Sequence, residues 1–137
     1  QIPISAPGVT PLGDGRGELA AELVDRGALA GGWTEDAGGW RAYFDAEQVD
    51  LSRLTLRVRR PGDRMQPLGM GGNTKEIREL MIGVKLPRAA RRRYPLLAEG
   101  ERVIWFPGFR LDERVKVSGG TRRVLVLTMR RRGEATR

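Results

Sequence analysis

The sequence predicts one small domain of mainly β-structure with short helices, and three observations lead to that prediction. The chain has 137 residues, a length that suits a single domain and allows a hydrophobic core. Short apolar stretches, alternating or continuous and bounded by glycine and proline, recur through residues 54–130, as they do in β-proteins. Clear start and stop signals for helices occur in two short segments between residues 73 and 94.

The first third of the chain gives weaker signals. Residues 1–16 are rich in glycine and proline, which indicates an extended segment with turns. Residues 17–25 fit either a helix or a strand, and residues 27–33 predict little regular structure. Residues 39–49 contain three aromatic side chains and predict a strand that ends near Asp45.

Residues 54–59, "LTLRVR", alternate strictly between apolar and polar side chains. The apolar residues share one face of the predicted strand, which leaves Arg57 and Arg59 on the opposite face. We therefore expect a half-buried strand with a basic outer face. The sequence "PGD" at residues 61–63 predicts a turn directly after it.

Two short helices are predicted next. We expect Asn73 to cap the first helix, with Glu76 as its capping-box partner. Apolar residues then follow at helical spacing, namely Ile77, Leu80 and Met81. Gly83 is expected to end this helix. The second helix is predicted to start at Pro87, which suits the first helical position, and it must finish before Pro95.

The last third of the chain predicts strands again. Residues 102–108, "RVIWFPG", indicate a buried strand that ends at its proline. Residues 114–117 and 123–130 predict two further strands joined by a Gly-Gly turn. Residues 124–127 are apolar on both faces, which favours a central strand. Residues 131–137 predict a flexible basic tail.

The composition excludes several kinds of catalytic site. The chain has no cysteine and no histidine, which removes thiolate ligands, the commonest general base and the commonest zinc ligand. The glycine loop "GMGGNTK" lacks the Gly-Lys-Ser/Thr of a Walker A motif. The stretch "SGGTRR" has arginines where an ATP-pyrophosphate loop needs Asp and Ser, so we expect a hairpin turn there. We predict no catalytic residue, no metal site and no cofactor in this chain.

Charge is distributed unevenly along the chain. Residues 1–52 carry three arginines and nine acids, a net charge of −6, whereas residues 53–137 carry 22 basic and eight acidic groups, a net charge of +14. Such a basic segment suggests a polyanionic partner, with nucleic acid as the first candidate. An anionic membrane surface is the alternative, but no basic run here accompanies a long apolar helical face.

The densest basic run is "KLPRAARRR", residues 85–93, and no acid occurs between Glu79 and Glu99. Arg88, Arg91 and Arg92 fall at helical spacings of three and four, so they share one face of the predicted helix. This run is either a solvated helix face or a binding site for anions. Upstream, the glycine loop before Lys75 is either an ordinary loop or a site for one phosphate at a helix N-terminus.

Several motifs occur in a specific order between residues 54 and 117. They are "VRRPGDR", "PLG", a lysine that opens a predicted helix, "VKLPR", "YPLL" and "VIWFPGFRLDE". With these motifs the segment resembles the C-terminal domain of the tRNA(Ile)-lysidine synthetase family, and residues 1–53 resemble the weaker preceding part of the same region. The resemblance implies a small β-sandwich with short helices, a fold shared with a domain of the phenylalanyl-tRNA synthetase β subunit.

The resemblance also implies a function in tRNA modification. Enzymes of this family are ligases that use ATP, with Mg²⁺, to join lysine to the wobble cytidine of the tRNA(Ile) with a CAU anticodon. Catalysis belongs to an N-terminal domain whose ATP loop is absent from this chain, and the C-terminal domain is implied to bind the tRNA body toward the acceptor stem. The implied partners are that tRNA and the catalytic domain, in the cytoplasm, with no membrane.

We therefore expect residues 54–130 to form a basic tRNA-binding core, with residues 1–53 as the N-terminal part of the same domain. The expected RNA contacts are Arg57, Arg59, Arg64, Lys75, Lys85, Arg88, Arg91, Arg92 and Arg93. The alternative is a charge-driven interdomain or dimerisation module, including a homodimer, without direct RNA contact. The sequence departs from the family pattern at Glu76, where relatives often have a basic residue.

Overall fold

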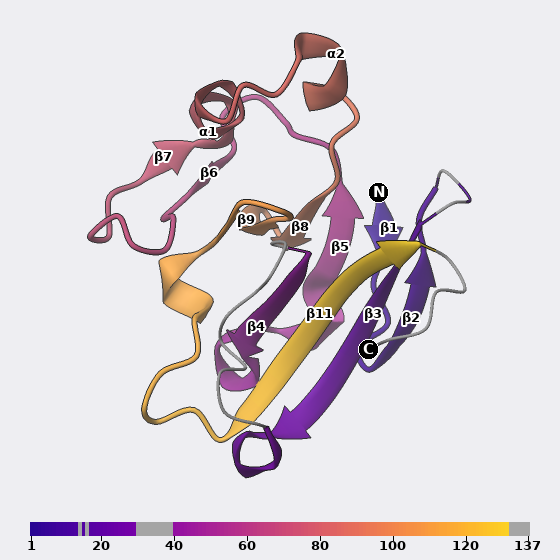
Figure 1. Ribbon diagram of the computed structural model, residues 1–137, viewed down its shortest axis with the longest axis vertical. Coiled ribbons are helices and arrows are strands. Elements are labelled where there is room, and N and C mark those ends of the chain that lie inside the picture. The colour runs from indigo at the N-terminus through magenta and orange to yellow at the C-terminus, as the bar shows by residue number, and fades with distance from the viewer. Residues whose placement is uncertain (14, 16, 30–39, 132–137) are drawn as a thin grey trace.

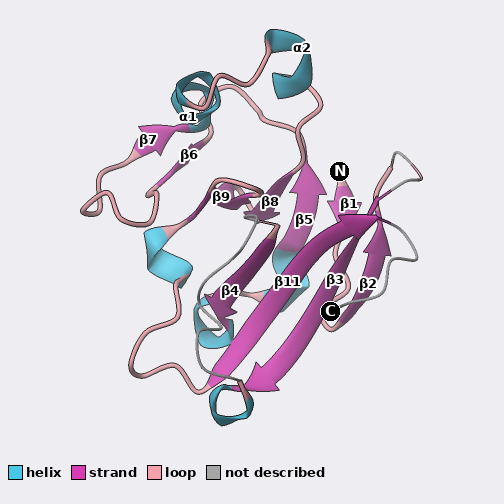
Figure 2. Cartoon of the chain, viewed as in Figure 1, coloured by secondary structure: helices cyan, strands magenta, loops and turns pink. Residues whose placement is uncertain are grey.

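The computed structural model describes residues 1–13, 15, 17–29 and 40–131. Strands dominate its regular structure (Figure 2), which confirms the predicted mainly β fold with short helices. One sheet has five strands in the order β1-β5-β8-β9-β10, and every neighbouring pair is antiparallel. These strands are β1 (Ile2–Pro3), β5 (Leu54–Arg57), β8 (Leu96–Glu99), β9 (Arg102–Phe106) and β10 (Arg110–Leu111).

The second sheet has four strands in the order β2-β3-β11-β4. These strands are β2 (Gly8–Pro11), β3 (Gly17–Asp25), β4 (Arg41–Asp45) and β11 (Arg123–Arg131). β11 pairs with β3 along its whole length and with β4 on its other edge, which confirms the prediction of a central strand. The ambiguous segment 17–25 is a strand because its alternate residues Leu19 and Ala21 enter the core while its backbone pairs with β11.

The main core fills the space between the two sheets, which lie one behind the other in Figure 1. It combines Leu19, Ala21 and Phe44 from the first part of the chain with residues of β5, β8, β9 and β11. Phe44 of one sheet meets Trp105 of the other edge to face, with ring centroids 6.1 Å apart. The two parts of the chain therefore share one hydrophobic core.

A second layer covers the outer face of the five-stranded sheet at one end of the molecule. It consists of the hairpin β6 (Arg64–Met65) and β7 (Lys75–Glu76), followed by helices α1 (Ile77–Gly83) and α2 (Arg88–Arg91), at the top of Figure 1. Its own core cluster contains Met65, Ile77, Met81, Leu96, Val103 and Phe106. Each such fully buried side chain contributes about 1.5–3 kcal/mol, so the helices are held firmly on the sheet.

Two local predictions are wrong. Asn73 does not cap α1: the helix begins four residues later, after Glu76, whose side chain makes no capping bond, and Lys75 lies in β7. Residues 114–117 do not form a strand, because the Asp112 carboxylate accepts a hydrogen bond from the Arg114 amide and starts a short 3-10 helix, η4 (Glu113–Val115). The Gly-Gly segment is therefore a loop into β11 and does not join two strands.

Three other 3-10 turns complete the regular structure, η1 (Arg26–Ala28), η2 (Ala46–Gln48) and η3 (Leu51–Arg53). The predicted tail 131–137 contributes only its first residue, at the end of β11, and the rest of it lies outside the described residues, as does most of the segment 27–33. Within the described part of the chain, no helix is long and apolar enough to cross a membrane. The same part contains no cluster of three metal-ligating side chains.

Candidate nucleic-acid interface

Five arginines line one open cleft of about 360 Å³ beside the two helices. We call it the arginine cleft, and its residues are Arg59, Arg78, Arg88, Arg91 and Arg92. Across the described residues, no carboxylate forms an ion pair with any of these five side chains. Unpaired guanidinium groups around one hollow create a local positive potential that attracts a polyanion.

Helix α2 contributes Arg88 and Arg91, and Arg92 follows directly as its C-cap residue. Arg88, Arg91 and Arg92 lie on one face, as their spacing predicts, and the Arg91 Nε donates to the Leu86 carbonyl oxygen at 2.8 Å. That bond ties the Arg91 side chain to the backbone just before the helix, while the side chains of Arg88 and Arg92 remain exposed. The sequence-based prediction of a shared arginine face is therefore confirmed.

Tyr94 anchors α2 to the sheet. Its ring packs edge to face on Phe106 with centroids 5.3 Å apart, and its hydroxyl donates to the Pro107 carbonyl oxygen. Burial raises the pKa of Tyr94 to about 12, so the hydroxyl keeps its proton and this hydrogen bond at neutral pH.

Arg78 is a cleft residue that the sequence analysis missed. It follows Ile77 on α1, and since Ile77 and Met81 face the core, Arg78 projects into solvent beside α2. The available signal was the position of Arg78 in the predicted helix: it is a basic residue next to the buried stripe, directly before Glu79 and the acid-free segment that follows. Helical periodicity alone gives no contact between α1 and α2, so the tertiary arrangement was needed to join Arg78 to the cluster.

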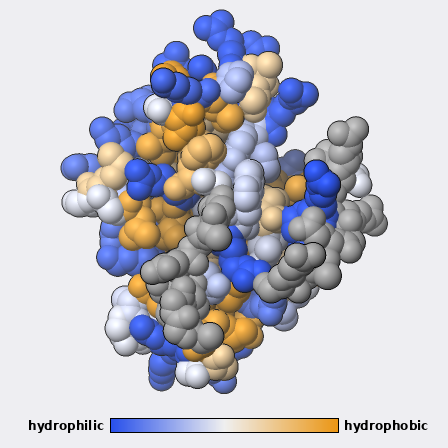
Figure 3. Space-filling view, in the orientation of Figure 1, coloured by the Kyte–Doolittle hydropathy of each residue, from blue (hydrophilic) through white to orange (hydrophobic). Residues whose placement is uncertain are grey.

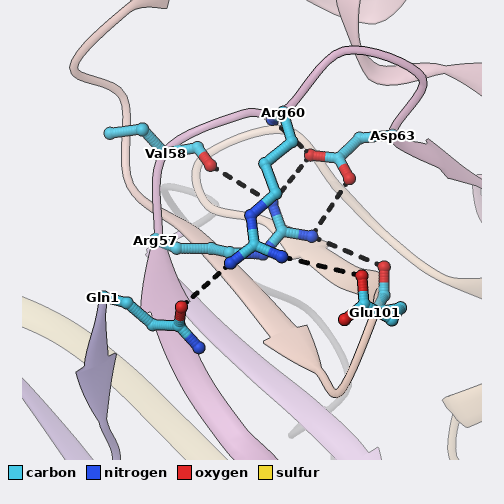
Figure 4. Close-up of polar contacts among 6 residues, drawn as sticks. All are labelled: Gln1, Arg57, Val58, Arg60, Asp63 and Glu101. Atoms are coloured by element: carbon cyan, nitrogen blue, oxygen red, sulfur yellow. Dashed lines mark hydrogen bonds and ion pairs between the residues drawn. The ribbon is translucent and has the colours of Figure 1, made fainter.

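Arg57 corrects the predicted basic outer face of the strand. In the register of β5 and β8, Arg57 lies opposite Leu96, so both side chains project on the same face, under the second layer. The Arg57 side chain is only 3% exposed and forms a two-point bond with the Asp63 carboxylate, at 2.7 and 3.0 Å (Figure 4). Arg57 is therefore a structural residue beneath the surface, and the expectation that it faces solvent is wrong.

Asp63 holds the connection between β5 and β6 in place. Burial by itself would raise the pKa of Asp63, but hydrogen bonds from the Arg57 guanidinium and the Arg60 amide outweigh it and lower the pKa below its usual value. Arg60 in turn donates to the Gln1 side chain at 2.9 Å and lies 3.6 Å from the Glu101 carboxylate (Figure 4). Because Asp63 binds Arg57 and the backbone of Arg60, on either side of Arg59 along the chain, the backbone holds Arg59 at the cleft.

The other predicted contacts lie outside the cleft. Arg64 is exposed and 3.5 Å from Glu76 across the β6–β7 hairpin, next to Lys75 in β7. Lys85 is exposed at the end of α1. Arg93 lines a separate groove of about 300 Å³ with Val58 and Pro95.

The glycine loop before Lys75 was considered as a site for one phosphate, but the structure places a carboxylate of the protein there. The Gly69 amide donates to the Glu113 carboxylate at 3.3 Å, and Glu113 also pairs with Lys116. These bonds lower the pKa of Glu113 and place negative charge at the loop.

Of the nine predicted contact residues, the structure brings four together in the arginine cleft: Arg59, Arg88, Arg91 and Arg92.

Comparison with known proteins decides the family. A family model described as "TilS substrate C-terminal domain" matches residues 54–128, which include every residue of the arginine cleft. The chain belongs to the TilS C-terminal domain family.

Relatives of this TilS domain are named tRNA(Ile)-lysidine synthase. The protein from Symbiobacterium thermophilum is 35% identical over 98% of this chain and 27% of its own length. The protein from Geobacter sulfurreducens is 38% identical over 94% of this chain and 26% of its own length. The chain therefore spans about a quarter of the curated relatives that it matches.

A solved structure agrees with the family assignment. It is titled "Crystal structure of TILS C-terminal domain" and superposes with a TM-score of 0.78 at 28% sequence identity. The match covers 97% of each chain. The likeness therefore extends through residues 1–53 as well as the segment that the family model matches, and the resemblance predicted from the motifs is confirmed.

Proposed function

We propose that this chain is the tRNA-binding domain of a tRNA(Ile)-lysidine synthase and that the arginine cleft holds phosphates of the bound tRNA. The observation that carries the proposal is the convergence of five arginines, without a carboxylate partner among the described residues, on one open cleft. The names of the relatives supply the identity of the RNA as tRNA(Ile).

Arginine suits this role because of its shape. The planar guanidinium presents parallel N–H groups that bind two oxygens of one phosphate, and it stays charged at any physiological pH. An A-form RNA stem is recognised mainly through phosphates and 2′-hydroxyls. A cleft walled by two helices and the β5–β6 connection would therefore select the shape of a stem more than its base sequence.

The proposed place of the domain in the whole enzyme follows from the family. The parent ligase would use ATP and Mg²⁺ in its N-terminal catalytic domain to join lysine to the wobble cytidine of the tRNA with the CAU anticodon, in the cytoplasm. This chain would position the tRNA body, toward the acceptor stem, for that reaction. Loss of the cleft would then weaken tRNA affinity and raise the KM for tRNA while leaving the chemical step unchanged.

A binding experiment tests the proposal. The chain is titrated into labelled tRNA(Ile), the same tRNA without its acceptor stem, and a DNA duplex of equal length, each at two salt concentrations. We expect the intact tRNA to bind most tightly and the truncated form to bind more weakly. Equal affinity for all three nucleic acids would contradict the proposal, since non-specific charge attraction would then explain the binding.

The alternative of a charge-driven interdomain or dimer contact has less support. Acids of the first part of the chain already pair with arginines in β11 or directly before it: Glu18 with Arg130 at 2.7 Å and Glu47 with Arg122 at 3.1 Å. These internal pairs consume part of the acidic surface that such a contact would need. Light scattering of the chain without RNA tests the dimer form of this alternative, because a salt-sensitive dimer would support it.

A further inference from the structure

Two large aromatic side chains are exposed next to α2. Trp40 is 46% exposed and Phe109 is 42% exposed. Phe109 lies against Phe106 and Tyr94, with ring centroids 4.7 and 6.1 Å away. We call the surface formed by Trp40, Tyr94 and Phe109 the aromatic shelf.

Gly108 brings the members of the shelf together. Its backbone φ is 89°, a left-handed conformation that favours glycine. A Cβ atom at this position would lie 3.5 Å from the Trp40 ring and 3.2 Å from the Tyr94 hydroxyl. The turn after β9 therefore lets the indole approach closely and sets Phe109 at the surface beside it.

The register of the sheet places the shelf next to the arginine cleft. The pairs Arg57↔Leu96, Leu97↔Trp105 and Arg110↔Phe106 bring the end of β5, the start of β8 and the β9–β10 turn to the same end of the sheet. Arg59, helix α2 and the shelf thus follow one another along that end. Figure 3 shows hydrophilic side chains over the two helices at the top, with hydrophobic side chains directly below them.

The two segments that carry Tyr94 and Phe109 are basic. Residues 86–98 and 102–111, which form α2 and the β9–β10 turn, contain no acid. Arg93 precedes Tyr94 and Arg110 follows Phe109 in these segments, and both arginines are exposed. Exposed aromatic rings among unpaired cations are the combination that binds single-stranded nucleic acid, since the rings stack on bases and the cations attract the backbone.

We propose that the aromatic shelf stacks one or two unpaired nucleotides that adjoin the RNA stem held in the arginine cleft. This inference rests on the proposed function, because the stem must first occupy the cleft. Base stacking tolerates any sequence, since every base has a π-face. The cleft would recognise the duplex, and the shelf would recognise the point where the duplex ends.

The test compares two RNAs that share one stem. The first is a blunt hairpin, and the second carries a four-nucleotide single-stranded 3′ extension. We expect the extension to raise the affinity of the chain roughly tenfold, within the range of a single stacked base. In Phe109→Ala that gain should disappear while the affinity for the blunt hairpin stays unchanged.

Two further variants make the test specific. Phe109→Leu keeps an apolar side chain without a π-face, so it should stay folded and still lose the gain, whereas Phe109→Tyr should retain it. Circular dichroism and thermal unfolding check the fold of each variant. Loss of the gain in Phe109→Leu with an unchanged Tm assigns the effect to stacking.

The possible outcomes separate this inference from the proposed function. If neither RNA binds, the proposed function fails and the stacking proposal fails with it. If the blunt hairpin binds but the extension adds no affinity, or if Phe109→Ala keeps the gain, only the stacking proposal is overturned. A dimer that Phe109→Ala dissociates, with no gain from the extension, would assign the shelf to protein association and also overturn it.

Discussion

Two groups of arginines in this domain have opposite surroundings. Arg57, Arg102 and Arg114 bind their carboxylate partners Asp63, Glu99 and Asp112 at 2.7 to 2.9 Å. The arginines of the cleft have no carboxylate partner among the described residues, although they come from the same basic half of the chain. The side chains are chemically identical, so the position of the acids separates the two groups.

This comparison shows why net charge is a poor guide to a binding site. The +14 of residues 53–137 counts both groups equally. A buried pair such as Arg57 and Asp63 neutralises itself and orders the backbone, whereas an exposed, unpaired arginine keeps its potential for an external anion. Arg59 illustrates the connection between the groups, because the paired residues on either side of it hold it at the cleft.

The largest expected effect comes from breaking the buried pair. Asp63→Ala leaves the Arg57 guanidinium buried without its carboxylate and should lower the free energy of unfolding by about 3–5 kcal/mol. Urea unfolding measures the change. Glu101→Ala is the matched control, since its side chain is 91% exposed and its loss should change stability very little. Equal stability of the two variants would contradict the assigned role of Asp63.

Removing the arginines of α2 and its C-cap should weaken tRNA binding and leave the stability of the fold nearly unchanged. Replacing Arg88, Arg91 and Arg92 together by alanine should weaken tRNA binding by about 2–4 kcal/mol, because charged hydrogen bonds to phosphate are lost. Stability should change little, since these side chains are exposed or half-buried and unpaired with acids. The control is the double variant Arg122→Ala with Arg123→Ala, which should keep full affinity. Arg123 begins β11 and Arg122 precedes it, and the start of β11 lies at the bottom of Figure 1, whereas α2 lies at the top.

Low pH should destabilise the fold by protonating the carboxylates that pair with arginines. The pKa values of Asp63 and Asp112 are lower than usual, because hydrogen bonds from arginines and backbone amides outweigh the effect of burial. Both carboxylates therefore contribute stability above the pKa of the unfolded chain, near pH 4, and lose it as pH falls through their folded values. Urea unfolding at a series of pH values should show the decline below about pH 4. Stability that stays constant down to pH 2 would contradict it.

The smallest effect is expected at an exposed pair. Glu47 and Arg122 lie 3.1 Å apart, but their side chains are 46% and 81% exposed. Glu47→Gln should therefore change the free energy of unfolding by less than about 0.5 kcal/mol. If Glu47→Gln lowered the free energy of unfolding as much as Asp63→Ala, burial would not explain the difference between the exposed and the buried ion pair.

The sequence predicted the parts of the fold that local patterns determine. The helix stripe of Ile77 and Met81 and the shared face of Arg88, Arg91 and Arg92 follow from periodicity. The central strand β11 follows from its apolar run, and the strand ending at Asp45 follows from its aromatic residues. The hairpin β6–β7 was missed, since two-residue strands carry no periodic signal. The 3-10 turn at Glu113 was missed because a single Asp cap outweighed the strand propensity of the valines.

The candidate site was predicted only in part for a similar reason. Alternation placed Arg57 on the face opposite the apolar residues, which is correct, but the second layer covers that face as well. Arg78 joins the cleft only because α1 and α2 pack on the same end of the sheet. Both results depend on contacts between segments distant in sequence.

The salt dependence of tRNA binding tests the central claim most directly. For the wild-type chain, five neutralised phosphates predict a slope of log K against log salt of about −4.5, by analogy with B-DNA. The variant without the arginines at 88, 91 and 92 should have a slope shallower by about 2.7, because three fewer counterions are released. An unchanged slope and affinity in the folded triple variant would contradict the account.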